Sequence, residues 1–326
     1  MKFAVIGTNF ISHNFMQAAK HLPEFELVAV CSGQLENAKK FAETYQVDYY
    51  TDNYQEILTN QAIDAVYIAT PNSLHYEPSI YFLKNKVHVL CEKPLASNLT
   101  EVNAMIETAQ ANQVLLMEAI IPVTLTNFFE VKKQLPKLGT IRRALFQLGK
   151  YSSRYDSYRD GVILNAFKNE LSNGSLMDMG VYSVYNVVAL FGVPEKIFAN
   201  AYLLKTQVDG LGSMIFSYPE MEAVLMHSKI TDTHLKSEIQ GEDGNLLITG
   251  NSSYNKLELA LRNQPVADIT VKQCEDTMYY ELKEFMECIK AGKLESSLVP
   301  YQLMRDVHHV MTEIRKLINV SYPADK

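Results

Sequence analysis

The sequence predicts an α/β protein in which a doubly wound parallel sheet is followed by an α+β domain built on an open, mostly antiparallel sheet. Over the first 120 residues, short apolar runs alternate with amphipathic helical stretches. Beyond residue 120 this rhythm stops, and from 196 to 272 only strand and turn patterns remain. Regular alternation indicates parallel strands with crossover helices, whereas strands with helices segregated to the ends indicate an α+β domain.

Short apolar runs predict the strands of the first domain. They span residues 2–6, 26–31, 49–50, 65–69, 87–91 and 114–118. Helices cover both faces of a parallel sheet, which explains why these runs are almost continuously apolar. Helical apolar spacing predicts the crossover helices, which span residues 12–22, 35–45, 54–59, 76–85 and 99–112.

The second domain begins where the alternation ends, near Ile120 and Pro122. We therefore expect a first domain of residues 1–120 and a second domain of residues 121–326, with a cleft at their junction. The predicted elements of the second domain are a helix at 128–135, a strand at 141–151, a polar aromatic loop at 152–160, a helix at 176–191, strands over 196–272 and closing helices at 279–291 and 300–318. The closing helices could pack back on the first domain.

The composition excludes several classes of partner. The chain has 326 residues, a net charge of −7 and no block of Lys or Arg, so we expect neither nucleic acid nor a membrane. No apolar run approaches the ~18 residues of a membrane span, and the start reads as a strand instead of a signal peptide. The four cysteines form no C-x-x-C pair, and no set of His, Asp or Glu has the spacing of metal ligands. These features predict a cytoplasmic protein without a metal.

A glycine turn follows the first strand and opens a helix, which is the position of the dinucleotide fingerprint G-x-G-x-x-G/A. The turn consists of Gly7, Thr8, Asn9, Phe10, Ile11 and Ser12. Only the first glycine is present: Asn9 replaces the second and should hinder a pyrophosphate, while Ser12 is small enough to replace the third. An ordinary strand–turn–helix is the alternative, and the surrounding β-α-β pattern favours a dinucleotide.

The residue at the end of the second strand contacts the ribose of such a cofactor and distinguishes NAD from NADP. Its tip contains Ser32 and no acid, so nothing there repels a 2′-phosphate, and no Arg clamps one. The missing negative charge favours NADP over NAD. Lys39 and Lys40 follow on the next helix, where a solvated helix face is the alternative to a phosphate contact.

Two further strands end in polar clusters. One runs into Thr70, Pro71, Asn72, Leu74 and His75, and the other into Glu92, Lys93 and Pro94. Ligands of open α/β sheets bind just outside the carboxyl ends of the strands. A lysine held there, partly desolvated, can exchange a proton with a substrate. An isolated Glu-Lys-Pro would more simply be a surface turn, but the second cluster and the glycine turn favour a functional site.

Asp178 and Tyr182 lie four residues apart on one face of the predicted helix at 176–191. A tyrosine hydroxyl near a lysine can join a proton relay, and an aspartate can orient both groups. The alternative is an aspartate stabilised by the helix dipole beside a half-buried tyrosine.

Together these residues resemble the glucose–fructose oxidoreductase/inositol dehydrogenase (Gfo/Idh/MocA) family over nearly the whole chain. The matching pieces are residues 5–7, 69–72 with His75, 92–95, 174–180 and the closing helices ending at 321–323. Within the family, residues 116–120 and Tyr182 resemble the dimeric dihydrodiol dehydrogenase branch.

The resemblance implies a Rossmann domain, a substrate domain whose open sheet joins subunits as a homodimer or homotetramer, and NAD(P)-dependent oxidation of a sugar, cyclitol or diol, or the reverse reduction. It implies that Lys93 handles the proton of the carbinol oxygen, that Asp178 orients the substrate or Lys93, and that Tyr182 stands where many members have histidine. Around the cofactor it places Thr70, Pro71, Asn72, Leu74, His75, Glu92, Pro94 and Glu118.

Two other functions stay open. The eroded glycine turn motivates a non-catalytic dinucleotide-binding protein, although retention of Lys93, Asp178 and Tyr182 argues against it. Some relatives use tightly held NAD for a lyase-like or glycosidase-like reaction.

The substrate is not named by the sequence. Aromatic and Arg side chains at 151–159 suit polyhydroxyl or carboxylate groups.

Overall fold

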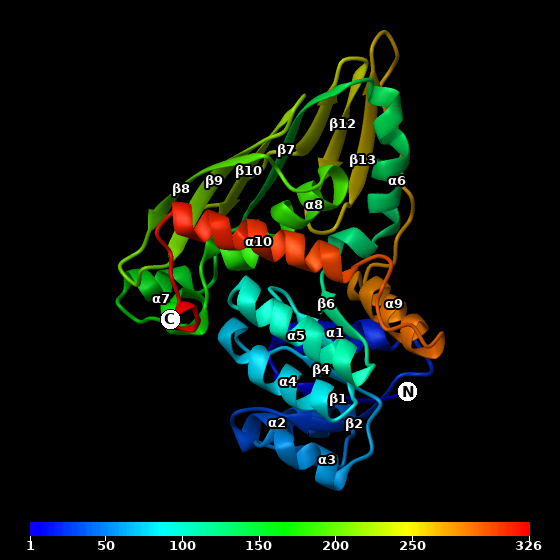
Figure 1. Ribbon diagram of the computed structural model, residues 1–326, viewed down its shortest axis with the longest axis vertical. Coiled ribbons are helices and arrows are strands. Elements are labelled where there is room, and N and C mark those ends of the chain that lie inside the picture. Colours follow the sequence, from blue (N-terminus) through cyan, green and yellow to red (C-terminus); the bar gives the residue numbers. More distant parts are fainter. The chain divides into compact units, whose positions relative to one another are not determined.

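The computed structural model describes residues 1–326, and the chain divides into two compact units (Figure 1). The first unit comprises Met1–Ile120 and Cys274–Met304, and the second comprises Ile121–Gln273 and Arg305–Lys326. The chain therefore passes between the units three times.

The first unit is built on a six-stranded parallel sheet with the order β3-β2-β1-β4-β5-β6. Its strands are β1 (Lys2–Ile6), β2 (Glu26–Cys31), β3 (Tyr49–Thr51), β4 (Ala65–Ile68), β5 (His88–Glu92) and β6 (Leu116–Ala119). Successive strands are added on one side of β1 up to β3 and on the other side from β4 onward. This reversal creates the switch point where open α/β sheets bind ligands. The predicted doubly wound parallel sheet is confirmed.

Helices connect the successive strands of this sheet, as parallel pairing requires. The helices of the first unit are α1 (Phe10–Ala19), α2 (Leu35–Tyr45), α3 (Ile57–Asn60), α4 (Tyr76–Lys84), α5 (Leu99–Asn112) and α9 (Met278–Lys290). The side chain of Asn98 begins α5 by accepting a 3.0 Å hydrogen bond from the N–H of Glu101. Although α9 comes from late in the chain, it packs against α1, β5 and β6.

The core of the first unit is aromatic at its centre. The rings of Phe15 and Tyr67 stack with their centroids 3.7 Å apart. Phe3 of β1 contacts Phe285 of α9 at 6.1 Å between centroids. Both contacts join the sheet to a helix, so they fix α1 and α9 on the strands that end at the switch point.

The second unit is built on an eight-stranded sheet with the order β14-β13-β12-β11-β7-β10-β9-β8. Its strands are β7 (Ile141–Gly149), β8 (Lys196–Leu203), β9 (Asp209–Ser217), β10 (Glu222–Ser228), β11 (Ser237–Gly241), β12 (Gly244–Thr249), β13 (Lys256–Leu261) and β14 (Ala267–Asp268). Only β7 and β10 pair in parallel, which confirms the predicted open, mostly antiparallel sheet. The helices are α6 (Thr126–Gln134), α7 (Tyr155–Arg159), α8 (Val181–Phe191) and α10 (Tyr301–Leu317), and α8 packs on β7 and β10.

The segment predicted as a loop at 152–160 contains a helix, α7, so that expectation was wrong. Tyr155 and Tyr158, three residues apart, both pack on the buried ring of Phe167, at 5.6 and 5.3 Å between centroids. Long-range packing on one apolar ring therefore selects the helical conformation, although the local sequence is polar.

The helix predicted at 176–191 also differs in its first turn. Residues Leu176–Gly180 form a π-helical turn, and the α-helix begins only at Val181. The backbone N–H of Leu176 donates a 2.6 Å hydrogen bond to Oδ2 of buried Asp209. This contact anchors the first turn from outside the helix, and π-helical turns of this kind are frequent at functional sites.

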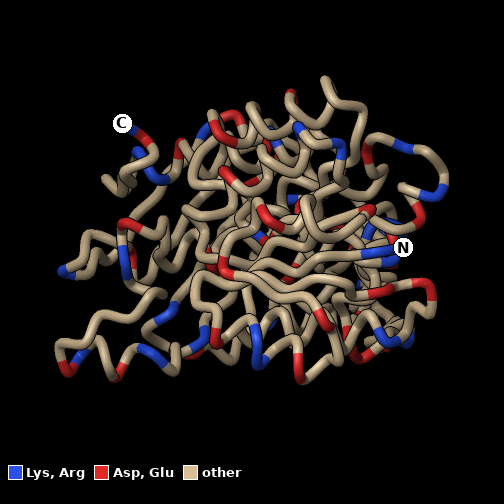
Figure 2. Tube along the Cα trace, turned by 90° about the horizontal axis from the view of Figure 1, so that it is seen from below, with Lys and Arg blue, Asp and Glu red and all other residues tan.

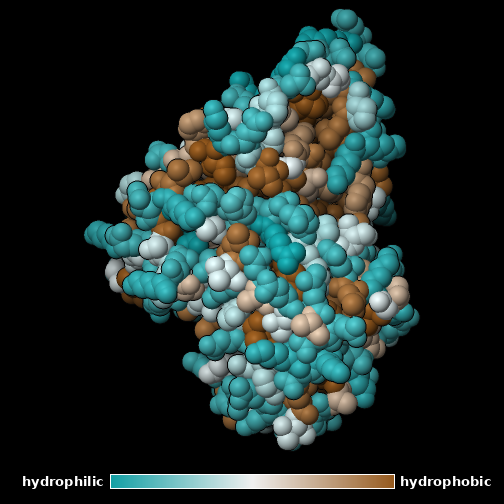
Figure 3. All heavy atoms as spheres, viewed as in Figure 1, coloured by the Kyte–Doolittle hydropathy of each residue, from teal (hydrophilic) through white to brown (hydrophobic).

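Charged side chains are distributed over the whole chain. Figure 2 shows Lys and Arg interspersed with Asp and Glu along the trace, without a continuous basic tract. None of the helices combines the length and the apolar character that a membrane crossing needs. Hydrophobic side chains gather over the eight-stranded sheet in the upper part of Figure 3.

Candidate cofactor and active site

The glycine turn lies at the switch point beside the end of β4. Gly7 has a φ of +96°, and a Cβ atom added there would lie 2.3 Å from the carbonyl oxygen of Ala69. Both the positive φ and the lack of space require glycine. Ser12 donates a 2.7 Å hydrogen bond from Oγ to the carbonyl oxygen of Gly7, so it secures the turn that it was predicted to fit.

The side chains of the turn reach the two neighbouring strand ends. Asn9, at the position of the second fingerprint glycine, donates a 3.3 Å hydrogen bond from Nδ2 to the carbonyl oxygen of Ala69. Thr8 donates a 3.1 Å hydrogen bond from Oγ1 to Oγ of Ser32 at the tip of β2. Asn9 is therefore turned toward β4, and Phe10, the next residue, is 65% exposed. The backbone cradle fits a dinucleotide pyrophosphate at the start of α1.

Charged groups near the ribose position have partners of their own. Lys40 pairs with Glu36 at 3.5 Å, and Lys39 with Glu43 at 4.0 Å, both along the exposed face of α2. These lysines thus behave as a solvated helix face. Ser32 remains the polar side chain directly at the tip of β2, as predicted.

The loop after β4 is tied to the loop after β5 by His75. Its buried ring contacts two carbonyl oxygens at 2.9 Å, that of Pro94 through Nδ1 and that of Thr70 through Nε2. Burial lowers the pKa of His75, although both carbonyl contacts favour protonation. Thr70 donates a 2.9 Å hydrogen bond to the carbonyl oxygen of Leu74, whose side chain is 50% exposed. His75 is thus the link between the two strand-end clusters.

Lys93 lies between two anchored neighbours and is itself half-buried. On one side, buried Glu92 accepts a 2.6 Å hydrogen bond at Oε1 from the hydroxyl of Tyr67. On the other, the N–H of Leu95 donates a 3.0 Å hydrogen bond to Oε1 of buried Glu118. These two hydrogen bonds anchor the residues on either side of Lys93. Pro94 follows through a cis peptide bond.

A buried pair of carboxyl groups lies near Lys93, and no sequence pattern marks its second member. Glu281 of α9 is fully buried, and neither of its carboxyl oxygens has a hydrogen-bond partner. Burial and the charge of Glu92 raise the pKa of Glu281 well above its ordinary value, which Lys93 opposes. Burial also raises the pKa of Glu92 to about 7, although the hydrogen bond from Tyr67 and the charge of Lys93 both lower it. Both carboxyl groups therefore hold a proton more readily than an exposed glutamate does.

In the second unit, Asp178 is held by a lysine that the sequence analysis missed. Nζ of buried Lys229 lies 2.8 Å from Oδ2 of Asp178 and donates a 3.2 Å hydrogen bond to the carbonyl oxygen of Ala166. The same ammonium sits 5.4 Å from the centroid of the Phe167 ring. Lys229 belongs to no local motif, so only tertiary structure could reveal it. The contact with Lys229 therefore orients the carboxyl group of Asp178.

The turn that carries Asp178 rests on a buried Asp–His pair. Asp209 and His227 lie 3.7 Å apart, and Nδ1 of His227 is 2.9 Å from Oγ of Ser175. A Cβ atom added at Gly174, whose φ is +140°, would lie 2.2 Å from Oδ1 of Asp209. Burial raises the pKa of Asp209 to about 6 and lowers that of His227 to about 3, so His227 is neutral at pH 7.

The predicted site residues therefore form two groups. The turn residues 7–12 with Ser32, and the loops 70–75 and 92–95 with Glu118, belong to the first unit. Asp178 and Tyr182, one turn apart, belong to the second unit, as does α7 in the predicted substrate loop.

The sheet order, the glycine turn at the switch point and the lysine at the end of β5 define an oxidoreductase that binds a nicotinamide dinucleotide. The chain belongs to the Gfo/Idh/MocA family. Residues 1–120 match its domain described as "Oxidoreductase family, NAD-binding Rossmann fold", and residues 137–247 match its C-terminal domain. The resemblance inferred from the sequence is confirmed.

Relatives with known names cover the whole chain. Scyllo-inositol 2-dehydrogenase (NADP(+)) IolU of Bacillus subtilis is 44% identical over 326 residues, which are 100% of this chain and 99% of the relative. Trans-1,2-dihydrobenzene-1,2-diol dehydrogenase of Danio rerio is 29% identical, with coverage of 100% and 99%. The crystal structure of aldose-aldose oxidoreductase from Caulobacter crescentus, complexed with glycerol, superposes with a TM-score of 0.86 at 22% identity and coverage of 98% and 97%. This chain is an NAD(P)-dependent oxidoreductase of CH–OH groups.

Proposed function

We propose that this protein is an NADP-dependent dehydrogenase of a cyclitol, with scyllo-inositol or a closely related polyol as its substrate. The observation that carries the proposal is the 44% identity, over both full lengths, to a scyllo-inositol 2-dehydrogenase that uses NADP(+). The absence of an acid at the tip of β2 and the Thr8–Ser32 contact support NADP. In this proposal the first domain, residues 1–120, holds the cofactor, and the second, residues 121–326, holds the polyol.

Three residues carry the proposed chemistry. The bound nicotinamide accepts or returns the hydride. Lys93, as the free amine, takes the hydroxyl proton from the carbinol oxygen, and its ammonium returns that proton in the reduction. Asp178, fixed by Lys229, accepts a hydrogen bond from a substrate hydroxyl, and the Tyr182 hydroxyl passes the proton toward solvent.

The cofactor contacts that we propose come from residues of the first unit. The N–H groups at the start of α1 bind the pyrophosphate above Gly7. Exposed Phe10 and Leu74 supply apolar contacts to the flat rings. The loops joined by His75 then hold the nicotinamide next to Lys93.

The decisive experiment measures NADPH and NADH formation with scyllo-inositol, myo-inositol, a trans-dihydrodiol and glucose. We expect NADPH formation with an inositol and a higher kcat/KM than for the diol. Lys93→Met should cut kcat by at least ~10²-fold with little change in NADPH affinity, whereas Lys84→Met, an exposed lysine on α4, should leave both unchanged. Tight NADPH binding without turnover of any polyol would instead favour a non-catalytic binding protein, and product formation without net cofactor reduction would favour the lyase-like use.

We also propose that subunits associate through the open face of the eight-stranded sheet, as a homodimer or homotetramer. Phe198, Tyr202 and Ile215 on this face are 59%, 59% and 41% exposed, and Phe198 and Ile215 are cross-strand neighbours. A hollow of about 440 Å³, lined in part by Tyr202, indents the same face. Large exposed apolar patches mark association sites.

Sedimentation velocity tests the association. Phe198→Glu with Tyr202→Glu should give a monomer, and Leu35→Glu, an exposed leucine of the first unit, should leave the oligomer intact. A monomeric wild-type protein would reject the proposal.

We place the enzyme in the reducing cytoplasm because its four cysteines are free and three of them are buried.

A further inference from the structure

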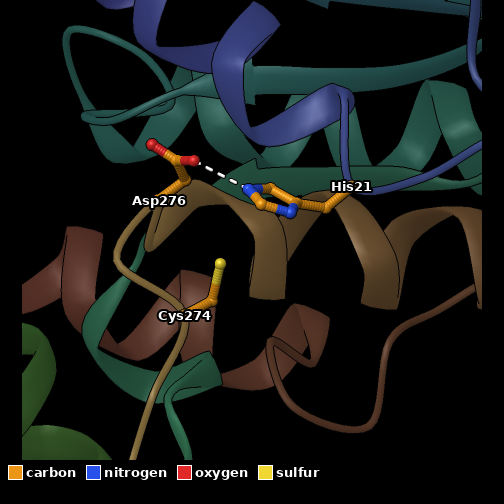
Figure 4. Close-up of side chains that lie close together, drawn as sticks. All are labelled: His21, Cys274 and Asp276. Atoms are coloured by element: carbon orange, nitrogen blue, oxygen red, sulfur yellow. Dashed lines mark hydrogen bonds and ion pairs between the residues drawn. The ribbon is translucent and has the colours of Figure 1, made fainter.

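Three potential metal ligands from distant parts of the sequence meet on the surface of the first unit. They are His21, just after α1, and Cys274 and Asp276, just before α9 (Figure 4). Their ligand atoms, one nitrogen, one sulfur and one carboxylate oxygen, all lie within 4.8 Å of one another. Because one ligand is far from the other two along the chain, no spacing motif marks the set. The sequence therefore favoured the absence of a metal.

The chemistry of these ligands selects the ion. A thiolate is a soft ligand that disfavours Mg²⁺ and Ca²⁺, whereas a Cys–His–Asp set suits Zn²⁺ and ions that resemble it. Ligands bound at roughly 2.0–2.3 Å to a tetrahedral zinc ion lie roughly 3.3–3.7 Å apart. Rotations of these side chains would bring the three ligand atoms from their present separations to the distances that zinc requires. Nε2 of His21 and Oδ2 of Asp276 are now 2.7 Å apart and would separate slightly around an ion.

Two adjacent tyrosines of α9 hold the ligands in place. The Tyr280 hydroxyl accepts a 2.9 Å hydrogen bond from the backbone N–H of Cys274. The N–H of Tyr279 donates a 2.9 Å hydrogen bond to the carbonyl oxygen of Asp276. The rings of Tyr279 and His21 also meet in a T-shaped arrangement, with centroids 5.9 Å apart. The ligand backbones are therefore positioned before an ion arrives, as effective metal sites require.

We propose that His21, Cys274 and Asp276 form a binding site for Zn²⁺ or a similar divalent transition metal, with water as the fourth ligand. The side chains of His21 and Asp276 are 46% and 42% exposed, so an ion can enter and water can complete the coordination. The site is separate from the strand ends that face the cofactor. It crosslinks α1 to the segment through which the chain re-enters the first unit at Cys274. Zinc would therefore stabilise this unit instead of taking part in hydride transfer.

Titration of the intact protein with Co²⁺, followed by absorption spectroscopy, tests the site directly. We expect saturable 1:1 binding with a thiolate-to-cobalt charge-transfer band in the near ultraviolet, and displacement of that band by Zn²⁺. Cys274→Ser should abolish the band. His21→Gln and Asp276→Asn, both surface changes, should weaken binding by at least ~10-fold.

Matched variants test whether other thiol or imidazole groups of the chain bind Co²⁺ instead. Cys288→Ser removes another thiol of α9, and His234→Gln removes an exposed histidine of the second unit; both should bind Co²⁺ like wild type. Zn²⁺ should raise the melting temperature of wild type and of these controls but not that of His21→Gln. A charge-transfer band that persists in Cys274→Ser, or no saturation below millimolar Co²⁺, would overturn the proposal and leave an ordinary His–Asp surface contact.

Discussion

The hydroxyl of Tyr67 donates a 2.6 Å hydrogen bond to the carboxylate of Glu92, one residue before the lysine that we assign to proton transfer. Tyr67 is fully buried and its ring stacks on Phe15 of α1, the helix that opens at the glycine turn. The Tyr67 side chain thus connects α1 with the end of β5.

Removal of this hydroxyl should destabilise the protein. In Tyr67→Phe, the Glu92 carboxyl loses its donor while it stays buried, so the free energy of unfolding should fall by about 1–3 kcal/mol in urea titrations at pH 7. Tyr81→Phe removes an exposed hydroxyl that donates to the carbonyl oxygen of Gln55 and should cost less than ~0.5 kcal/mol. Equal stability losses in the two variants would contradict the importance of the buried bond.

The pair of Glu92 and Glu281 should make stability fall as pH rises. Both pKa values are raised in the folded protein, so above about pH 4.5 the folded state holds protons that the unfolded chain releases. The free energy of unfolding should therefore decrease from pH 4.5 upward, and the contribution of Glu92 is lost by pH values above about 7. Glu281→Gln keeps a neutral side chain at every pH. It should flatten this decline and be more stable than wild type at pH 8.

Urea titrations from pH 5 to pH 8 measure the effect, with Glu287→Gln on the exposed face of α9 as the control. A wild-type stability that rises over this range with the same slope in Glu281→Gln and in Glu287→Gln would exclude a buried proton at Glu281.

Loss of Lys229 should impair substrate handling without affecting the cofactor. Lys229→Met leaves Asp178 without its ammonium partner, so we expect kcat/KM for the polyol to fall by about 10–100-fold while the Kd for NADPH stays constant. Lys229→Arg should recover part of the loss because it restores the charge. Lys196→Met, at the exposed start of β8, should behave like wild type. If Lys229→Met weakens NADPH binding as strongly as it lowers turnover, its effect is general disruption of the fold.

A negative charge at the tip of β2 should change the cofactor preference. In Ser32→Asp the carboxylate repels a 2′-phosphate and can accept hydrogen bonds from ribose hydroxyls. NADPH affinity should fall at least ~10-fold while NADH affinity holds or improves, as measured by nicotinamide fluorescence. Ser297→Asp, an exposed position far along the chain, should change neither affinity. Unchanged discrimination in Ser32→Asp would mean that the 2′-phosphate binds elsewhere.

Local patterns predicted much of the fold. Buried parallel strands are apolar for a few residues and end in turns, so β1, β4 and β5 were visible in the sequence. The helical conformation of α7 was not visible in the sequence, because it depends on the packing of its tyrosines against Phe167, which lies outside the helix.

Side chains at strand ends were also accessible to prediction, because the topology brings the carboxyl ends of parallel strands to one edge. His75 and Lys93 were found in this way. Glu281 and Lys229 were not, because Glu281 comes from a late helix, Lys229 follows β10 of the second unit, and neither belongs to a motif. Their importance arises from burial next to a second charged group, which single-sequence patterns do not encode.

The repeated passage of the chain between the two units limits how the protein can be synthesised and divided. A fragment that stops at Ile120 has all six parallel strands but lacks α9, which covers β5 and β6 and supplies Phe285 to the core. The nascent first unit therefore stays incomplete on the ribosome until almost the entire polypeptide has emerged. A chimera that exchanges cofactor domains between relatives must accordingly transplant residues 274–304 together with residues 1–120.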